Sequence, residues 1–429
     1  MRILFFSRYP SLFKSSHGST YHGEGWVSSL QETIEQTADD IDLGISFFFP
    51  KNENITQKGK ITCYPIFKKK KSNIQKLLYY WGGFKRKNTT HLPEVLNIIK
   101  DFKPDLIHVF GIESPFAFIA GNTEIPVIVH LQGILNPVLN AFFPQGMNRT
   151  TFLLKHFSIN EWLLRNGYNF AFDETKVRSQ REVSYFKNIK YFMGRTEWDF
   201  QISRIFSPHS EYFHIDEMLR PPFYESSSWK IPTSDKFVII STISETVYKG
   251  LDIILKTAQF LKQHNILNFE WRVIGVTGNS KYVRFFEKNY QIKGENVNIT
   301  YLGILNAEQI CANFQQAHTY AHPSYIDNSP NSLCEAQLIG LPVIGTYVGG
   351  IPSLITHDET GLLVPVNAPY ELAYQLQYLC QHPEVMMRLS KKAREIAICR
   401  HSKEKIMKNL LFAYQQIQNE YKLKNKHFE

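Results

Sequence analysis

The chain has 429 residues, of which 43% are hydrophobic and 20% are charged, and its formal net charge is +9. This length allows two domains of ordinary size, and this composition is that of a globular rather than a disordered protein. No stretch approaches the roughly 18 consecutive apolar residues of a membrane-spanning helix. The excess of positive charge indicates an anionic partner without identifying it.

Cysteine usage and the first residues indicate a cytoplasmic protein. The five cysteines are scattered, with no C-x-x-C spacing, which argues against a disulfide framework or a zinc site and suits a reducing compartment. The apolar run over 2–7 is too short for a signal peptide and is better explained as a first strand. We therefore expect a cytoplasmic location, and peripheral attachment to the inner face of the membrane stays open.

The first predicted elements have the order of a Rossmann-like unit. A buried strand over 2–7 precedes a polar loop with Gly23 and Gly25, an amphipathic helix and a strand over 41–49, which is the opening of such a unit. Ser28 occupies the third glycine position of a dinucleotide fingerprint, so that fingerprint is incomplete. The two glycines suit either a loop that approaches a phosphate or a plain turn.

A basic and aromatic segment follows, over Lys68–Lys87. Four lysines at 68–71 precede a run of leucine, tyrosine, tryptophan and phenylalanine side chains, and Lys85, Arg86 and Lys87 close the segment. One interpretation is a solvated loop and a helix whose apolar face packs inward. The other is a patch that binds an anionic membrane surface. No nucleic-acid-binding motif accompanies these charges, so we expect no nucleic-acid partner.

Two residues at predicted strand ends are site candidates. A strand over 125–131 ends with His130, in the position where parallel sheets place their ligands, although a structural role is an alternative. Arg195 lies in the glycine turn after a later strand. It could meet an anion, or it could pair with Glu197 or Asp199.

A second strand–helix series begins after a proline- and serine-rich segment over 221–232, which we predict to be a linker. The last predicted element is an amphipathic helix over 402–421. Strand–helix alternation twice over predicts an α/β protein with two doubly wound parallel sheets. The strands predicted in the second series cover 237–241, 271–276, 297–302 (before Gly303), 318–322 and 343–345.

The stretch over 321–354 carries the strongest chemical signal. A strand gives way to a polar turn, and a helix follows, for which Ser329 is the expected N-cap and Pro330 the first residue. An exposed helix N-terminus after a strand is a natural anion site. Asp327 and Glu335 are eight residues apart and can line one pocket. The alternative is an ordinary strand–turn–helix unit with surface acids.

This stretch resembles the family-4 retaining glycosyltransferases, also called glycosyl transferases group 1. The resemblance rests on Pro-Ser, an acidic residue, seven residues and Glu-Ala, followed by Gly-Leu-Pro-Val-Ile-Gly and Val-Gly-Gly-Ile-Pro. Two positions depart from the family pattern. Asp327 replaces the first glutamate of E-x7-E, and Ser244 replaces the arginine of Gly-Arg-Leu-x-x-x-Lys-Gly, in which Lys249 and Gly250 match.

The resemblance implies a GT-B fold, with two Rossmann-like doubly wound parallel-sheet domains facing a central cleft. Residues 1–220 would form the acceptor-binding domain and residues 221–401 the nucleotide-sugar-binding domain. Residues 402–429 would form a C-terminal helix that packs back on the N-terminal domain.

The resemblance also implies roles for individual residues. Glu335 would accept hydrogen bonds from the ribose, Asp327 would contact a hydroxyl of the donor sugar, and His130 would lie near the transferred sugar. The base would lie against Gly303. The groups that would stabilise the diphosphate are Lys249, the loop with Gly23 and Gly25, Arg195 in place of the arginine missing at Ser244, and the amides of Asn331, Ser332 and Leu333.

The implied activity is retaining transfer of a hexose from a UDP- or GDP-linked sugar to a glycan or lipid-linked acceptor, in surface polysaccharide biosynthesis. No D-x-D-type acidic pair stands at a strand end, so we expect no metal, and no cofactor besides the nucleotide-sugar donor. Two alternatives remain: a non-catalytic glycan- or membrane-binding relative, and a nucleotide-sugar epimerase on the same fold. A Rossmann oxidoreductase fits less well, because the glycine fingerprint is incomplete.

Overall fold

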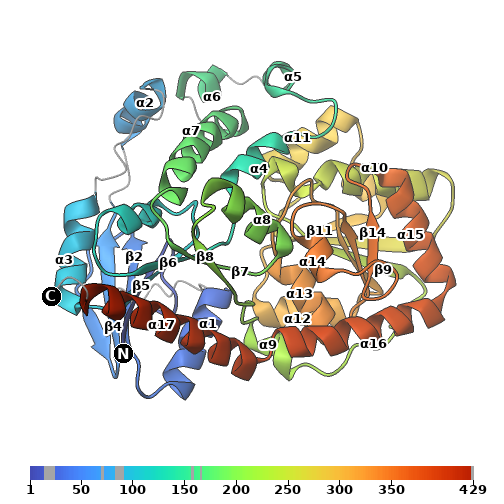
Figure 1. The fold of residues 1–429 in the computed structure, drawn as a ribbon. Helices are drawn as coiled ribbons and strands as arrows, with labels where there is room; N and C mark the ends of the chain where they lie inside the picture. Colours follow the sequence, from blue (N-terminus) through green and yellow to red (C-terminus); the bar gives the residue numbers. More distant parts are fainter. Residues whose placement is uncertain (14–24, 69–71, 83–90, 156–158, 165–166, 427–429) are drawn as a thin grey trace. The chain divides into compact units, whose positions relative to one another are not determined.

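The computed structural model describes residues 1–13, 25–68, 72–82, 91–155, 159–164 and 167–426 (Figure 1). The chain divides into two compact units. Unit 1 comprises residues 1–139, 159–218 and 402–429, and unit 2 comprises residues 140–158 and 219–401. Two assignments differ from the expected domains, because residues 140–158 and residues 219–220 belong to unit 2. Residues 140–158 are the larger difference. The reason is aromatic packing within that unit, where the buried ring of Phe152 lies 4.6 Å from the ring of Phe285.

Unit 1 is built on an eight-stranded sheet that is parallel except at one edge, where β3 runs antiparallel to β4. Its strands are long apolar runs, which is typical of parallel strands that are covered on both faces. From β4 onward the spatial order of the strands is that of a Rossmann sheet. Successive strands are added on one side of β1 as far as β4 and on its other side from β5 onward, so the strand order reverses between β1 and β5. In spatial order the strands are β3 (Thr56–Lys58), β4 (Ile61–Phe67), β2 (Asp42–Phe49), β1 (Arg2–Ser7), β5 (Leu106–Phe110), β6 (Val127–His130), β7 (Tyr191–Gly194) and β8 (Glu211–His214).

Each face of this sheet packs against its own set of helices, because successive strand residues point to opposite faces. Ile3 and Phe5 belong to a core formed with α1 (Trp26–Thr37) and α17 (Lys403–Lys426). Leu4 and Phe6 belong to the opposite core. The helices and the 3-10 turn that contribute to this second core are α3 (Leu92–Phe102), η2 (Pro115–Gly121), α7 (Tyr168–Phe186) and α8 (Glu197–Phe206).

Unit 1 also carries α2 (Asn73–Trp81), α4 (Leu135–Asn140, whose last residue falls in unit 2) and α6 (Ile159–Leu164). Of these, α2 lies in the predicted basic and aromatic segment. Residues 69–71 and 83–90 of that segment are outside the described residues. No helix among the described residues is both long enough and apolar enough to span a membrane.

Unit 2 is built on a six-stranded, all-parallel sheet in the order of a Rossmann fold, with its reversal between β9 and β12. In spatial order the strands are β11 (Ile299–Gly303), β10 (Phe269–Ile274), β9 (Phe237–Thr242), β12 (Thr319–His322), β13 (Val343–Thr346) and β14 (Leu362–Val364). The helices of unit 2 are α5 (Arg149–Lys155), α9 (Pro221–Glu225), α10 (Leu251–Gln263), α11 (Lys281–Tyr290), α12 (Ala307–Gln315), α13 (Asn331–Ile339), α14 (Ile351–Leu354), α15 (Pro369–Gln381) and α16 (Pro383–Arg400).

The predicted linker over 221–232 is wrong. Its prolines start the short helix α9 instead of extending the chain, since proline suits the first helical turn. Trp229 is 2% exposed, its backbone amide donates to the Ile339 carbonyl at 2.8 Å, and its indole Nε1 donates to the Ala317 carbonyl at 2.8 Å. This segment is therefore a packed part of unit 2.

Candidate functional site

The main group of predicted site residues lies at the reversal point of the unit 2 sheet. The loop after β9 contains Lys249, at the end of a short 3-10 turn over Val247–Lys249, and the loop after β12 contains Asp327. These two loops leave the carboxyl ends of neighbouring strands. In an open α/β sheet this is where ligands bind, because the two loops run in opposite directions and leave a crevice between them.

The structure joins Lys249 and Asp327 in an ion pair. The Nζ of Lys249 lies 2.5 Å from Oδ2 of Asp327, and Nε2 of His322 lies 2.9 Å from the same oxygen. Burial by itself would raise the pKa of Asp327, but the Lys249 charge and the His322 hydrogen bond outweigh it and hold that pKa well below its usual value. Burial would likewise lower the pKa of Lys249, but Asp327 outweighs it and raises that pKa. Both groups are charged at neutral pH.

A hydrogen-bond chain connects this pair to the start of α13. Burial lowers the pKa of His322, so its ring is neutral, and Nε2 carries the proton that Asp327 accepts. The other nitrogen, Nδ1, then accepts from the Tyr320 hydroxyl at 3.1 Å, and that hydroxyl lies 2.7 Å from Oγ of Ser332. Neither His322 nor Tyr320 was among the predicted site residues, although both lie in the predicted strand before Asp327.

Glycines allow the loops after β9, β12 and β13 to lie close together. Gly250 has a φ of +79°, and a Cβ at this position would lie 2.1 Å from the Pro323 carbonyl oxygen. Gly349 has a φ of +53°, and a Cβ there would lie 2.0 Å from the Asp327 carbonyl oxygen. The amide of Gly350 donates to that same oxygen at 3.0 Å. The side chains that surround Asp327 therefore depend on glycine in two neighbouring loops.

Glu335, in the second turn of α13, is fully buried and pairs with Arg220. The two carboxylate oxygens accept from Nε and Nη2 of Arg220 at 2.6 and 2.7 Å. This fork geometry is the strongest form of a carboxylate–guanidinium contact. Arg220 precedes α9 and was not predicted as a site residue. The chain around Arg220 carries no local signal of this pairing, because its partner is 115 residues away.

The start of α13 differs by one residue from the expectation. Pro330, not Ser329, is the N-cap, and the helix begins at Asn331. The Leu333 amide donates to the Pro330 carbonyl at 3.0 Å. Of the three amides predicted to meet a diphosphate, that of Leu333 is thus already bonded within the chain, while Asn331 and Ser332 form the first residues of the helix.

The remaining predicted residues of unit 2 lie at the same edge of the sheet. Ser244 is exposed in the loop after β9, where its Oγ lies 2.5 Å from Oγ1 of Thr246. Gly303 ends β11 with a φ of +72°. Both positions follow or end strands at the same edge of the sheet as Lys249 and Asp327, and their role in donor binding stays a prediction.

A second pocket, of about 300 Å³, lies at the reversal point of the unit 1 sheet. It is bounded by the loops after β1, β5 and β6 and by the start of α1. Gly25 lies at its edge as the N-cap of α1, with an ordinary φ of −136° and open space where a Cβ would be. Neither the backbone of Gly25 nor its packing against the described residues thus demands glycine there. Gly23 lies outside the described residues. The pocket is lined by Ser7, Arg8, Tyr9, Pro10, Ser11, Gly25, Trp26, Val27, Ser28, Phe110, Glu113, Ser114 and Gln132.

His130 was predicted to point into a cleft. In the structure its side chain is fully buried instead. Strand alternation places it on the same face as Ile128, in the layer that contains α1. Its ring lies 4.7 Å from the Trp26 ring and stacks 5.4 Å from that of His108. Burial holds the pKa of His130 well below its usual value, and its neighbours His108 and Arg195 act in the same direction.

Arg195 is also buried in unit 1, at 4% exposure. Its Nη1 lies 3.5 Å from the Glu217 carboxylate and its guanidinium lies 5.1 Å from the Trp26 ring centre. The alternative pairing with Asp199 does not form through the side chain, because Asp199 accepts from the Arg195 backbone amide instead. In this conformation the charge of Arg195 is compensated within unit 1.

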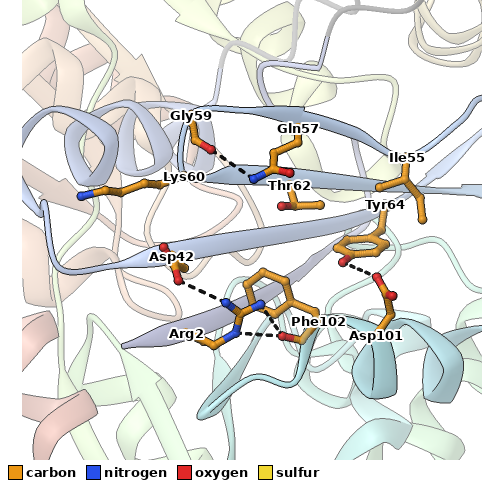
Figure 2. Close-up of a pocket in the computed structure, with 10 residues that line it drawn as sticks. All are labelled: Arg2, Asp42, Ile55, Gln57, Gly59, Lys60, Thr62, Tyr64, Asp101 and Phe102. Carbon is orange, nitrogen blue, oxygen red and sulfur yellow. Dashed lines mark hydrogen bonds and ion pairs between the residues drawn. The ribbon is translucent and has the colours of Figure 1, made fainter.

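A third pocket, of about 460 Å³, lies at the opposite edge of the unit 1 sheet, where the parallel strands begin (Figure 2). Its charged groups are bonded to one another: Arg2 contacts Asp42 and the Phe102 carbonyl, and the Tyr64 hydroxyl donates to Asp101 at 2.7 Å. Because these groups already satisfy one another, the pocket offers a ligand few free partners.

Comparison with known proteins finds similarity mainly in unit 2. Residues 224–396 match the family described as glycosyl transferases group 1. The putative colanic acid biosynthesis glycosyltransferase WcaL of Escherichia coli K12 is 29% identical over 164 residues, which cover 37% of this chain and 39% of WcaL. The D-inositol 3-phosphate glycosyltransferase of Corynebacterium efficiens is 34% identical over 104 residues, or 24% of each chain. The matched stretches thus span about two fifths or less of these relatives.

Solved structures agree along nearly the whole chain. Sucrose-phosphate synthase from Thermosynechococcus elongatus has a TM-score of 0.70 at 14% identity, covering 97% of this chain and 98% of the other. Anabaena Alr3699/HepE in complex with UDP and glucose has a TM-score of 0.62 at 14% identity, covering 97% and 100%. At this identity the likeness establishes the fold, two parallel-sheet α/β units of GT-B type, and nothing finer.

Proposed function

We propose that this protein is a member of the glycosyl transferases group 1, the family that residues 224–396 match, and that it transfers a hexose from a nucleotide-diphosphate sugar to a glycan or lipid-linked acceptor. The names of its relatives, among them WcaL, favour surface polysaccharide biosynthesis. UDP is the favoured nucleotide, since structural neighbours have been crystallised with UDP or UDP-glucose. We also propose that the anomeric configuration is retained and that no metal is required.

One observation carries the proposal: the Lys249–Asp327 pair at the reversal point of the unit 2 sheet. A partly buried ammonium at a ligand-binding edge is suited to stabilise a leaving diphosphate, and it would exchange part of its contact with Asp327 for the phosphate. Asp327 would then accept a hydrogen bond from a hydroxyl of the donor sugar. His322 and Tyr320 would hold the carboxylate in position, because they fix its orientation from the side of α13.

The second carboxylate, Glu335, would bind the ribose hydroxyls. In the present structure Arg220 donates to both oxygens of Glu335. For the ribose to bind, either Arg220 releases one of these oxygens, or Arg220 keeps both contacts while the ribose hydroxyls donate to the same carboxylate. We propose the latter, in which Arg220 remains beside Glu335 and faces a phosphate. This would supply the cation that is missing at Ser244.

Retention requires the acceptor hydroxyl to attack from the side of the leaving group. The bond from the anomeric carbon to the diphosphate oxygen breaks as the bond to the acceptor oxygen forms, and the acceptor proton passes to a phosphate oxygen of the leaving group. The protein would contribute charge stabilisation and positioning rather than a nucleophile.

A donor-hydrolysis and binding screen tests this proposal. Purified protein is incubated with UDP- and GDP-sugars, with and without EDTA, and binding and release of the nucleotide are measured. Slow release that EDTA does not affect is expected for one donor. Lys249→Ala should abolish this nucleotide release almost completely. Lys262→Ala, which removes a lysine from the end of α10 instead, should leave the release unchanged.

The outcomes separate the alternatives. Product formed from the nucleotide sugar alone, with no acceptor and no hydrolysis, would identify an epimerase. Absence of binding to every nucleotide sugar would exclude the transferase and leave a non-catalytic glycan- or membrane-binding protein. Activity abolished by EDTA and restored by Mg²⁺ would refute metal independence.

For the anionic partner we propose a membrane surface that contacts α2 and α6. These helices lie side by side in unit 1 (Figure 1), with the Trp81 Nε1 donating to the Leu163 carbonyl at 3.3 Å and the Trp81 and Trp162 rings 6.3 Å apart. Several of their apolar side chains are exposed. Those that are about half exposed or more are Ile74, Leu78, Trp81, Ile159, Trp162 and Leu163. Aromatic groups beside a lysine-rich segment are typical of interfacial binding.

Vesicle sedimentation tests the membrane proposal. The protein should bind vesicles of phosphatidylcholine and phosphatidylglycerol more strongly than vesicles of phosphatidylcholine alone. Ile74→Ala should weaken binding severalfold, whereas Ile205→Ala should not, although both isoleucines are 71% exposed. Equal binding by both variants, or no binding to anionic vesicles, would refute this surface.

A further inference from the structure

One helix of unit 2 presents a row of aromatic side chains to solvent. Tyr370, Tyr374 and Tyr378 lie four residues apart along α15, and His382 continues the row just after the helix ends. Residues four apart share one face of a helix and lie about 6 Å from one another along its axis. Tyr370 is 65% exposed and Tyr374 is 61% exposed, while Tyr378 is half-buried. These four residues are called the α15 aromatic row.

The packing of α15 does not account for this row. The helix contacts its neighbour α10 within unit 2 (Figure 1). Its buried residues are aliphatic and lie outside the row: Leu372, Ala373, Leu376 and Leu379. Exposed tyrosines add little to a core, because their rings remain in water. Several neighbouring aromatic side chains on the surface of a globular protein mark an interaction site, whereas single ones are ordinary.

The rings of the row contact one another. The Tyr374 and Tyr378 ring centres are 6.3 Å apart and the two ring planes are nearly parallel, at 13°. The Tyr378 ring lies 4.6 Å from that of His382. At the other end of the row, Tyr370 packs edge to face on Phe260 of α10, with ring centres 4.9 Å apart. These contacts restrict the rings, so a ligand would find the surface ordered in advance, at a smaller entropic cost.

Charge indicates the class of ligand. The chain has a formal net charge of +9, yet α15 contains no lysine or arginine, and Glu371 is its one charged residue. Glu384 contacts the His382 ring at the end of the row, at 2.9 Å. The other polar side chains of α15 include the neutral amides of Gln375, Gln377 and Gln381. Anionic membranes and nucleic acids need lysine and arginine, so this row suits a neutral partner.

A neutral glycan chain combines the properties that this surface would recognise. The C–H faces of a sugar ring are apolar and can pack on aromatic rings, while its hydroxyl groups form hydrogen bonds with phenols, amides and carboxylates. The tyrosine spacing of about 6 Å is similar to the length of one sugar unit, so successive sugars can each meet a ring. An apolar protein partner would instead bury the tyrosine hydroxyls and glutamine amides without hydrogen bonds.

We propose that the α15 aromatic row is a binding surface for a neutral polysaccharide chain, separate from the site that contains Lys249 and Asp327. Tyr374, near the centre of the row, would provide the main ring contact. The proposal goes beyond the transferase function and does not rest on it, because a glycan can bind here whether or not a nucleotide sugar is used. In a transferase, this surface would raise the local concentration of a glycan chain between successive transfers.

Isothermal titration calorimetry with neutral hexasaccharides tests the proposal. Maltohexaose and cellohexaose, which are α- and β-linked chains of glucose, are titrated into the whole 429-residue protein, with and without UDP. At least one hexasaccharide is expected to bind, and UDP should not change its affinity, because the two sites are separate. Glucose should bind at least about tenfold more weakly than the hexasaccharide, because it can contact only one ring of the row.

Two variants of Tyr374 separate ring contact from other effects. Tyr374→Ala should weaken hexasaccharide binding about tenfold, whereas Tyr374→Phe, which keeps the ring, should weaken it by about twofold or less. Phe412→Ala is the matched control, since it removes an aromatic ring that is 56% exposed on α17, and it should leave glycan binding unchanged. Melting temperatures close to that of the wild type are expected for all three variants.

The outcomes decide between a glycan and other occupants of the row. Equal affinity of the wild type and Tyr374→Ala for the hexasaccharide would overturn the proposal, as would failure of both hexasaccharides to bind. Tighter binding of the anionic chain hexagalacturonate would also overturn it. A wild-type dimer in sedimentation velocity that Tyr374→Ala dissociates would show that a second copy covers the row. Glycan binding without any use of nucleotide sugars would refute the transferase function and leave this surface standing.

Discussion

At the scale of single residues, two carboxylates of unit 2 are paired with cationic or hydrogen-bonding side chains. The oxygens of Glu335 are satisfied by Arg220, and Oδ2 of Asp327 by Lys249 and His322. Glu113 differs from both carboxylates, because its Oε2 has no partner within the described part of the chain. Pairing offsets the desolvation of the two charges, and removing one partner leaves the other uncompensated.

Removal of Glu335 should therefore destabilise unit 2. Glu335→Ala leaves Arg220, which is 14% exposed in its side chain, without its carboxylate, and we expect a loss of about 3–5 kcal/mol in the free energy of unfolding. Asp358→Ala, which breaks the exposed pair with Arg388, should cost about 0–1 kcal/mol. Urea titration monitored by tryptophan fluorescence measures both. Similar losses in the two variants would contradict this account.

Glu113 should make stability depend on pH in the opposite sense to a paired carboxylate. Burial raises its pKa to about 7 in the folded state from near 4.5 in the unfolded state, so between these values the folded state binds the extra proton and stability falls as pH rises. Above pH 7 the full penalty is present. Glu113→Gln should thus stabilise the protein at pH 8, by up to about 3 kcal/mol, and have little effect near pH 4.5. Urea titrations at the two pH values measure this difference, and an equal effect at both would exclude it.

At the scale of elements, the loops at the strand ends carry more of the site than the strands do. The strands bring Lys249 and Asp327 to the same edge of unit 2, but their contact also requires two loops to approach within hydrogen-bonding distance. That approach depends on Gly250, whose positive φ and close contact with the Pro323 carbonyl exclude a side chain, and Gly349 allows the loop after β13 to approach the Asp327 carbonyl in the same way.

Substitution of Gly250 tests this dependence. In Gly250→Ala the new Cβ would collide with the Pro323 carbonyl and occupy a left-handed backbone conformation, so we expect a loss of more than about 1 kcal/mol and a weaker Lys249–Asp327 contact. Gly25→Ser is the matched control, since a Cβ at Gly25 meets open space and serine is a good N-cap for α1. Differential scanning calorimetry compares them. A melting temperature that is unchanged in Gly250→Ala would show that the loop can relax.

At the scale of the whole chain, the last helix completes a unit that begins at residue 1. Ile406, Leu410 and Tyr414 of α17 lie in the same core cluster as the first strand. The Tyr414 hydroxyl is 2.7 Å from Nδ1 of His108, whose pKa burial lowers to about 3. The distant ends of the chain are thus parts of one hydrophobic core, with a buried polar contact that fixes their register.

Truncation tests the role of α17. A chain that ends at His401 would expose the apolar residues of this core, so we expect it to aggregate on expression, while a chain that ends at Lys426 should fold normally. Tyr414→Phe keeps the ring and loses the bond to His108, and should cost about 1–3 kcal/mol. Cooperative unfolding of a soluble 1–401 chain at the wild-type urea concentration would refute this role.

Local patterns in the chain were sufficient to predict the two parallel sheets and most strand positions, and they pointed to Asp327 and Glu335 as candidates, whereas Lys249 became a candidate only through the family resemblance. Apolar runs, glycines and helix caps are short-range signals, and the carboxyl ends of parallel strands collect the loops that follow them. The same signals misplaced the segment over 221–232, because proline and serine are common both in linkers and at the start of a short helix.

Tertiary structure decided which side chains meet. Arg220 and Glu335 are separated by 115 residues, and no spacing rule connects them. The burial of His130 follows from what covers its face of the sheet, and the free oxygen of Glu113 follows from the absence of a partner around it within the described residues. Burial and long-range pairing are properties of packing, which is set by the whole chain at once. In this protein they determine which charged groups are satisfied within the chain and which are not.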